Sequence, residues 1–269
     1  MLFSRFHLAL LAIPALFAAG CATAPDGSAP EDSLLASTPL YERTQPETGE
    51  VVEVARFSRL PPDGVPERWE PWLPLPNNSR TRYSVARLDG HTCMEADATN
   101  GNSALRRVIR ISPQRHPLVE WSWRVPRLAS DRDPRAASRP SPRARLMLAF
   151  HGDAGKLDLE QRVQLRMAKA MTGEGLPYSS LMYVWLNGVP AGTVVPSPYT
   201  ERVRLIAVDS DPRLFDRWVD MRRNVREDYL RAFGEEPGDI VAVGIYTDVD
   251  ANGAPGRAYY GDITFRAAP

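Results

Sequence analysis

Short runs of alternating or continuous apolar residues dominate the chain and predict β-strands. In "LVEWSWRV", residues 118–125, apolar and polar residues alternate, so that Val119, Trp121, Trp123 and Val125 share one face of a strand. The polar residues between them lie on the other face. This pattern is typical of a strand that packs against a core on one side.

Further strand-length runs follow, at residues 143–150, 180–186, 202–208, 239–247 and 259–265. The second and fourth of these runs are apolar on both faces, as expected of central strands that are covered on both sides. Asp89-Gly90 separates two earlier runs and predicts a tight hairpin between them.

Two segments show the helical period instead. Leu159, Val163, Met167 and Met171 recur every four residues and predict an amphipathic helix. A second stripe predicts a helix that ends before Gly234, and it consists of Leu214, Trp218, Met221, Val225, Tyr229 and Phe233. We therefore expect a mostly β fold, a jelly-roll-like antiparallel β-sandwich with two peripheral α-helices.

Residues 1–20 have the layout of a secretory signal peptide, with an apolar run that is too short to cross a bilayer. The sequence "AAGC" that ends at Cys21 resembles a bacterial lipobox, so we expect lipidation of Cys21 and a lipid anchor to the membrane. Ala22 in place of Asp favours the outer membrane, with the protein on its periplasmic face. Plain secretion is the alternative.

Composition divides the rest of the chain and excludes some partners. Residues 21–50 are rich in Pro, Ser, Asp and Glu, which is typical of a flexible tether, and residues 51–269 are expected to form a single β-sandwich domain. The 33 basic and 33 acidic residues give a formal net charge of zero, so no nucleic acid is expected as a partner. Lipidation of Cys21 would leave only Cys93, which excludes an intramolecular disulfide.

Several motifs resemble a known bacterial family. "WSWRV", "YVWLNG", "RNVREDYLRAFGEEP" and "YYGDITF" occur in this order between Trp121 and Phe265 and resemble the uncharacterised domain of unknown function 3047. The resemblance implies no reaction, substrate or ligand. The family usually carries an Asp-Asp pair shortly before the strand at 143–150, and this chain has Pro140 and Ser141 there.

The sequence contains no motif of a common catalytic class. It has no G-x-S-x-G elbow, no glycine-rich phosphate loop and no Cys or His pair with zinc-ligand spacing. His91, His116 and His151 stand alone beside predicted loops and are interpreted as surface histidines. These observations favour a protein that is not an enzyme, without excluding one.

Two aromatic pairs are candidate ligand-binding residues: Trp121 with Trp123, and Tyr183 with Trp185. Each pair points to one face of its strand. On an exposed sheet such rings stack on sugars, whereas between two sheets they fill the core. Both interpretations stay open at this point.

Four polar residues complete the candidate ligand-binding set. Arg124 and Arg145 bound an arginine-rich segment that can bind phosphate or carboxylate groups, unless it is only a solvated loop. Asn224 and Asp228 lie four residues apart in the second predicted helix, where they either line a pocket or anchor the helix.

Near the C-terminus "YTDVDANGAPGR" begins like a calcium-binding loop. Asp248 and Asp250, together with Asp262 in the last strand, are candidate ligands of one structural calcium ion. The twelfth position of such a loop is Tyr259 instead of an acid, and the Asn-Gly pair favours a simple hairpin turn.

The leading functional hypothesis is a non-catalytic envelope lipoprotein that binds or organises a component of the cell envelope, such as a carbohydrate polymer. One alternative is a hydrolase for an envelope glycan or ester, with Asp248, Asp250 or Asp262 as acid or base. The other alternative is an assembly factor that binds another envelope protein.

Overall fold

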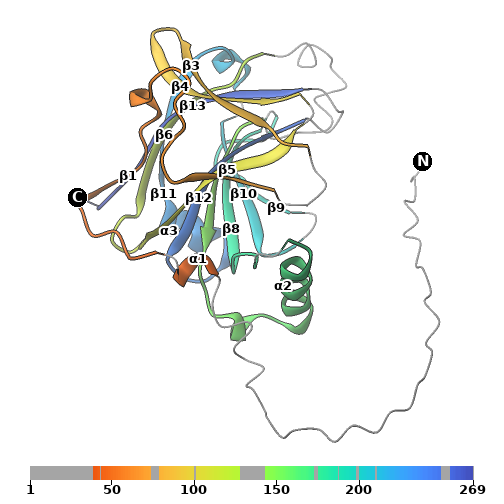
Figure 1. The fold of residues 1–269 in the computed structure, drawn as a ribbon. Coiled ribbons are helices and arrows are strands. Elements are labelled where there is room, and N and C mark those ends of the chain that lie inside the picture. The colour runs from red at the N-terminus through yellow and green to blue at the C-terminus, as the bar shows by residue number, and fades with distance from the viewer. Residues whose placement is uncertain are drawn as a thin grey trace, which may run out of the picture. The chain divides into compact units, whose positions relative to one another are not determined.

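Two β-sheets packed face to face form the protein, as the computed structural model shows (Figure 1). The structure describes residues 39–42, 44–73, 79–99, 101–127, 143–172, 175–186, 188–197, 200–209, 211–249 and 255–268. All of them belong to one compact unit, Ser33–Pro269. The predicted β-sandwich is confirmed.

The first sheet has six described strands, and β13 (Gly256–Arg266) lies at its centre. The order across it is β11 (Trp218–Asn224), β6 (Leu118–Arg124), β13, β4 (His91–Ala98) and β3 (Arg82–Leu88). The second half of β13 also pairs with β1 (Val51–Ala55).

The second sheet has seven described strands. Its order is β2 (Trp69–Trp72), β5 (Asn102–Ile111), β12 (Ile240–Asp248), β7 (Arg145–Phe150), β8 (Ser179–Trp185), β10 (Val203–Asp209) and β9 (Val194–Pro196). Among the described strand pairs of both sheets, only β8 with β10 is parallel. The runs predicted to be central, in β8 and β12, lie inside this sheet and not at its edges.

The hairpin predicted at Asp89-Gly90 is confirmed, and it joins β3 to β4. Asp89 has φ 52° and Gly90 has φ 80°, so both residues adopt the left-handed conformation that a two-residue turn of this kind requires. The neighbouring Cys93 is buried, and this burial raises the pKa of its thiol to about 11, with a further contribution from Glu95. Cys93 is therefore a small core residue and not a reactive thiol.

Three α-helices and three short 3-10 helices join the described strands. They are α1 (Pro39–Glu42), α2 (Leu159–Thr172), α3 (Val225–Phe233), η2 (Phe57–Arg59), η5 (Ala154–Lys156) and η6 (Pro212–Leu214). Figure 1 shows α2, in green, beside the lower end of the seven-stranded sheet. No helix in the described part of the chain is long and apolar enough to span a membrane.

The folded part begins earlier than the predicted boundary at Val51. Leu40 of α1 is only 1% exposed and packs on Ala149, Val241 and Ala242 of the seven-stranded sheet. The Glu47 amide then donates a hydrogen bond to the carbonyl oxygen of Arg110, 2.9 Å away. The end of the predicted tether is thus part of the domain, because one buried leucine and a strand-like contact hold it there.

The second predicted helix is correct only in its second half. Residues 212–214 form η6, and residues 218–224 form β11, which pairs with β6 along its whole length from Trp218 to Asn224. Only Val225–Phe233 is helical. In "WVDMRRN" the apolar residues Val219 and Met221 also alternate with polar ones, so the segment fits a strand once β6 offers it hydrogen bonds.

Candidate functional site

The two aromatic pairs predicted to bind a ligand lie in the core between the sheets. Trp121 and Trp123 come from β6, Tyr183 and Trp185 come from β8, and none of the four side chains is more than 3% exposed. The ring of Trp121 stacks on Tyr183 with centroids 5.2 Å apart, and Trp123 lies 6.5 Å from Trp185. The ligand-binding prediction is wrong, because both strands turn their aromatic face toward the opposite sheet.

Asn224 and Asp228 anchor α3 and are not free to bind a ligand. Asn224 caps the helix: its side-chain oxygen accepts a hydrogen bond from the Glu227 amide, and its Nδ2 donates one to the Glu227 carboxylate. Asp228 is buried, and its carboxylate accepts hydrogen bonds from Tyr183, Arg223 and Arg231. Of the two alternatives in the sequence, helix anchoring is correct.

Two of the three candidate metal ligands, Asp248 and Asp262, lie on different sheets. Asp262 lies on β13 and accepts two hydrogen bonds from Ser58, one from its amide and one from its hydroxyl. Asp248 lies on the other sheet and forms an ion pair with Arg145. Asp250 lies outside the described residues. Within the described ranges, no group of three or more His, Cys, Asp or Glu side chains is arranged to hold a metal ion.

Two of the three histidines are packed, contrary to the prediction that all are surface residues. His116 is 1% exposed, and its Nε2 contacts a backbone carbonyl oxygen. The ring of His151 stacks on Tyr41 with centroids 3.9 Å apart. Burial lowers the pKa of His151, Asp239 opposes this effect, and Arg110 reinforces it. Both histidines therefore take part in packing.

The outer face of the seven-stranded sheet carries a different set of side chains, which we call the outer platform. Strand pairing sets one row of it from β2 to β7, namely Trp72, Ala104, Tyr246 and Arg145. The adjacent row consists of Glu70, Arg106, Gly244 and Met147. These residues alternate with core residues such as Trp69 and Ile245, so they point away from the sandwich.

Two partly exposed rings stand on the outer platform. Trp72 and Tyr246 are separated by β5, so their positions lie roughly 10 Å apart, since neighbouring strands are about 4.8 Å apart. Ala104, the residue between them, is small. The platform thus carries two partly exposed aromatic side chains on either side of a buried alanine.

Each ring lies beside an arginine that is fixed by a carboxylate. Arg106 is 6% exposed, donates to the Glu70 carboxylate at 2.8 and 3.1 Å, and places its guanidinium 5.8 Å from the Trp72 ring centroid. Arg145 is 7% exposed, lies 3.0 Å from Asp248 and 4.4 Å from the Tyr246 ring centroid. Paired charges of this kind are held in fixed positions.

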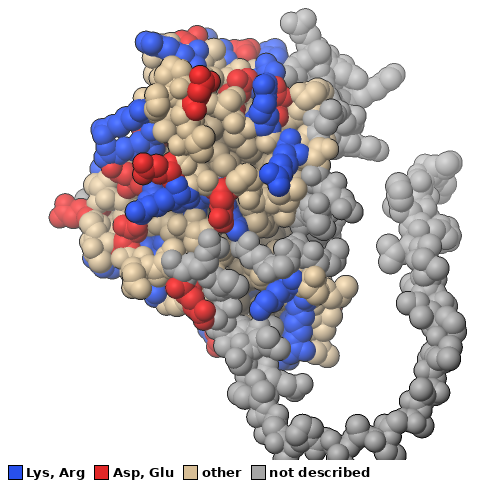
Figure 2. All heavy atoms as spheres, in the orientation of Figure 1, with Lys and Arg blue, Asp and Glu red and all other residues tan. Residues whose placement is uncertain are grey.

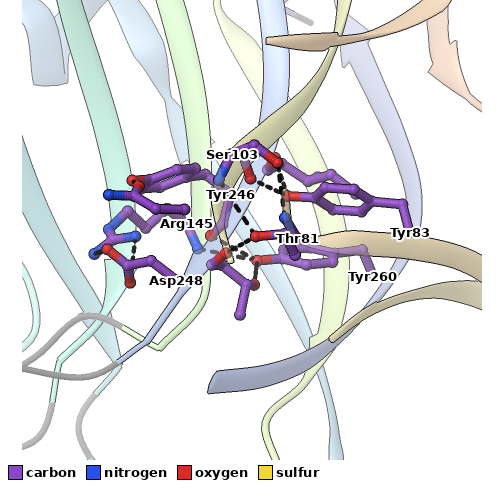
Figure 3. Close-up of polar contacts among 10 residues, drawn as sticks. Thr81, Tyr83, Ser103, Arg145, Tyr246, Asp248 and Tyr260 are labelled. Atoms are coloured by element: carbon purple, nitrogen blue, oxygen red, sulfur yellow. Dashed lines mark hydrogen bonds and ion pairs between the residues drawn. The ribbon is translucent and has the colours of Figure 1, made fainter. Parts of the chain in front are cut away.

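Hydrogen bonds from the six-stranded sheet hold the strands that carry Arg145 and Tyr246 in place (Figure 3). The Tyr260 hydroxyl reaches across from β13, lies 2.7 Å from the Thr247 hydroxyl and accepts a hydrogen bond from the Arg145 amide at 3.2 Å. Burial raises the pKa of Tyr260 to about 12, so this hydroxyl stays protonated at neutral pH. Tyr83 similarly donates to the Ser103 carbonyl oxygen at 2.8 Å.

A pocket of about 520 Å³ adjoins the platform at the edge of β5. Its charged lining residues are Glu47, Arg68, Glu70, Arg107 and Arg110. Two different segments lie beside β5 at this edge. Arg107 pairs with Trp69 of β2, and Arg110 pairs with Pro46, which precedes β1. The pocket lies between these two segments. Glu70 lines both the pocket and the platform, whereas Arg107 shares the inner face of the sheet with Trp69.

Arg107 lies at this pocket, and the backbone of β1 holds its side chain. One of its Nη atoms donates to two carbonyl oxygens of β1, those of Glu53 and Val54, while its buried Nε has no hydrogen-bond partner among the described residues. Burial lowers the pKa of the Arg107 guanidinium, Glu47 opposes this, and the like charge of Arg68 adds to it. An anion in the pocket would relieve this repulsion.

Sequence reasoning identified only Arg145 and Asp248 of this surface. The strand "GIYTD" carries the signal for Tyr246, because it alternates with the core residue Ile245. No comparable signal exists for Arg106 or Arg107, because their partners lie on β2 and β1, far away in the chain.

A comparison with known families gives the family of this chain. The sequence profile of the family described as "Protein of unknown function (DUF3047)" matches residues 67–264. The chain belongs to this family. The resemblance seen in the sequence motifs is thereby confirmed. No curated protein matches this DUF3047 chain.

Solved structures with similar folds include several modules of larger bacterial proteins. A family 11 carbohydrate-binding module from Clostridium thermocellum, in complex with a mixed-linked tetrasaccharide, is 10% identical, with a TM-score of 0.37 over 82% of this chain and 98% of that chain. The K1 adhesin domain of Lys-gingipain from Porphyromonas gingivalis is 9% identical, with a TM-score of 0.35 over 82% and 100%. A mannan-recognising module, TmCBM27, is 9% identical, with a TM-score of 0.31 over the same shares.

Proposed function

We propose that this DUF3047 domain is a non-catalytic module of the bacterial envelope that binds a carbohydrate polymer on its outer platform. The observation that carries the proposal is the row of Trp72 on β2 and Tyr246 on β12, with β5 between them and a fixed arginine beside each ring. The flat apolar face of an aromatic ring covers the C–H face of a sugar, and paired charges bind its hydroxyl groups.

The charges that line the adjoining pocket favour an acidic polymer over a neutral one as the ligand. Arg68, Arg107 and Arg110 contribute three positive charges to its lining, and Glu47 and Glu70 contribute two negative ones. Glu70 is already paired with Arg106, and Arg110 with Asp239. Arg68 and Arg107 remain with Glu47, which leaves one net positive charge for a carboxylate or phosphate group on the polymer.

The contacts of Asp248 and Asp262 support binding without catalysis. Asp248 is paired with Arg145, Asp262 is bound by Ser58, and they belong to different sheets. A glycosidase needs two carboxyl groups that flank one bond. These two described residues do not provide that arrangement.

The test is affinity electrophoresis and calorimetry with polygalacturonate and alginate as acidic polymers and dextran as a neutral polymer. We expect binding to an acidic polymer, and a loss of roughly tenfold or more for Trp72→Ala and for Tyr246→Ala. The matched control is Trp218→Ala, a half-buried tryptophan on the other sheet. Equal losses in all three variants, or no binding to any polymer, would refute the proposal.

A second comparison tests the pocket separately. Arg107→Gln keeps most of the side-chain volume and removes the charge, so it should weaken binding of the acidic polymers and make it less sensitive to salt. Binding of dextran as strong as that of alginate would show that the platform binds sugars without charge selection.

The proposed location rests on the N-terminal sequence, with a lipid anchor at Cys21 that holds the domain on the periplasmic face of the outer membrane. Mass spectrometry of the N-terminal peptide from the outer-membrane fraction should find an acyl group on Cys21 and none in Cys21→Ser. A Cys21 without an acyl group would contradict the anchor.

A further inference from the structure

The apolar stripe of α2 faces solvent. Leu159, Val163 and Met167 follow one another at intervals of four residues, so they lie on one face of the helix. Their exposed fractions are 71%, 43% and 59%. Exposed patches of large apolar side chains such as this one often mark a site that binds a partner.

The opposite face of α2 is turned toward the domain and is mixed, with Gln161, Gln164, Leu165 and Ala168 half-buried. Gln161 and Gln164 line a hollow of about 340 Å³ together with Ser197 and Thr200. An amphipathic helix on a globular protein normally buries its apolar face and exposes its polar face. Here the apolar stripe is exposed instead, and none of its three residues belongs to a core cluster.

Basic residues flank the stripe. Arg162, Arg166 and Lys169 follow one another along one side of it, and Lys156 lies just before the helix in η5. Lys156 and Lys169 are the only lysines of the chain. Figure 2 shows basic side chains beside uncharged surface at the place where Figure 1 shows α2.

The described acidic residues beside α2 are Asp158 and Glu160 at its start and Glu201 across the hollow. The Asp158 carboxylate accepts a hydrogen bond from the Gln161 amide at 2.8 Å and so caps α2. Glu160 lies in the first turn, where the helix dipole favours a negative charge. The remainder of the helix therefore has a net positive surface.

We propose that α2 is a membrane-contact helix that lies on an anionic phospholipid surface. Its apolar stripe enters the boundary between headgroups and acyl chains, and its basic flank binds the headgroup phosphates. Two partners could cover the stripe, a phospholipid surface or a second copy of the chain. The basic flank favours anionic phospholipid, because two copies of the helix would bring like charges together. The inference is independent of the proposed glycan binding.

The test is vesicle flotation with the chain from Ala22 onward, produced without an acyl group so that only the protein surface can bind. Vesicles of equal parts phosphatidylglycerol and phosphatidylcholine should carry the protein upward, and vesicles of phosphatidylcholine alone should not. Replacing Leu159, Val163 and Met167 by serine should reduce the bound fraction roughly tenfold or more.

The charge is tested by Arg162→Gln, Arg166→Gln and Lys169→Gln, each of which should weaken binding to the anionic vesicles roughly fivefold. The matched control is Val65→Ser, because Val65 is 79% exposed and lies away from α2. None of the substituted side chains belongs to a core cluster, so the fold should be retained, which circular dichroism verifies.

Three results would overturn the proposal. The first is no flotation with anionic vesicles, and the second is equal flotation of the serine variant and the Val65→Ser control. The third is a concentration-dependent dimer in sedimentation that the serine substitutions abolish, which would show that a second copy of the chain covers the stripe.

Discussion

The helices α2 and α3 begin alike and lie in opposite environments. Each starts with a reciprocal cap, Asp158 with Gln161 in α2 and Asn224 with Glu227 in α3. In α3 the apolar side is buried, since Val225 and Tyr229 are fully enclosed, whereas the stripe of α2 is exposed. The comparison teaches that helical periodicity predicts an apolar face but not what covers that face.

The difference arises from what each helix brings to the sandwich. α3 follows β11 directly and packs the Tyr229 ring between Phe150 and Phe233, with centroids 4.6 and 4.5 Å away. It also supplies Asp228 to the buried Tyr183 hydroxyl. None of the described side chains of α2 belongs to a core cluster, so α2 contributes little to the packing of the sandwich.

The largest effect in this comparison is expected for Asp228→Ala. The change leaves the buried Tyr183 hydroxyl without its acceptor and removes the partner of Arg223 and Arg231. We expect the free energy of unfolding to fall by about 3 kcal/mol, measured by urea denaturation. The control is Asp220→Ala on the exposed side of β11, which should change it by less than about 0.5 kcal/mol. Equal losses would mean that Asp228 is not an anchor.

The next effect is expected for Tyr229→Phe, which removes the hydroxyl 2.7 Å from the Ser179 hydroxyl. It should lower the free energy of unfolding by about 1–2 kcal/mol at neutral pH. Burial raises the pKa of Tyr229 to about 12, above the value of about 10 in the unfolded chain.

The folded state therefore holds this proton more tightly. The resulting stability is complete below about pH 10 and is lost as the pH rises toward about 12. Denaturation of both proteins between neutral pH and about pH 11 should show a shallower alkaline decline for Tyr229→Phe. The same slope in both proteins would argue against a buried tyrosine at this position.

A smaller effect is expected for Asn224→Ala, which removes the cap of α3 and should lower the free energy of unfolding by about 1 kcal/mol. Asn224→Asp retains an acceptor for the Glu227 amide and should recover most of the loss. Thermal denaturation of the three proteins measures the difference. An aspartate variant no more stable than the alanine variant would contradict the capping role.

The smallest effect is expected for the triple serine variant of α2. Leu159, Val163 and Met167 are exposed, so their replacement should lower the free energy of unfolding by less than about 1 kcal/mol. Urea denaturation alongside Asp228→Ala makes the contrast between the helices quantitative. A loss as large as that of Asp228→Ala would show that the stripe is packed in solution.

The sequence by itself determined the sandwich, the Asp89-Gly90 hairpin and the α2 and α3 segments. Strand alternation, turn residues and capping residues act over a few positions, so they can be read locally. The same local patterns could not show that residues 218–224 form a strand, because the deciding contact is the edge of β6, about a hundred residues earlier in the chain.

Only the tertiary structure decided which faces are inside. The pairs Trp121 with Trp123 and Tyr183 with Trp185 are buried because two sheets meet there, while Trp72 and Tyr246 lie on the outer side of one sheet. Period-two alternation gives two faces for each strand and does not say which one the other sheet will cover. For the same physical reason the stripe of α2 was visible in the sequence, and its exposure was not.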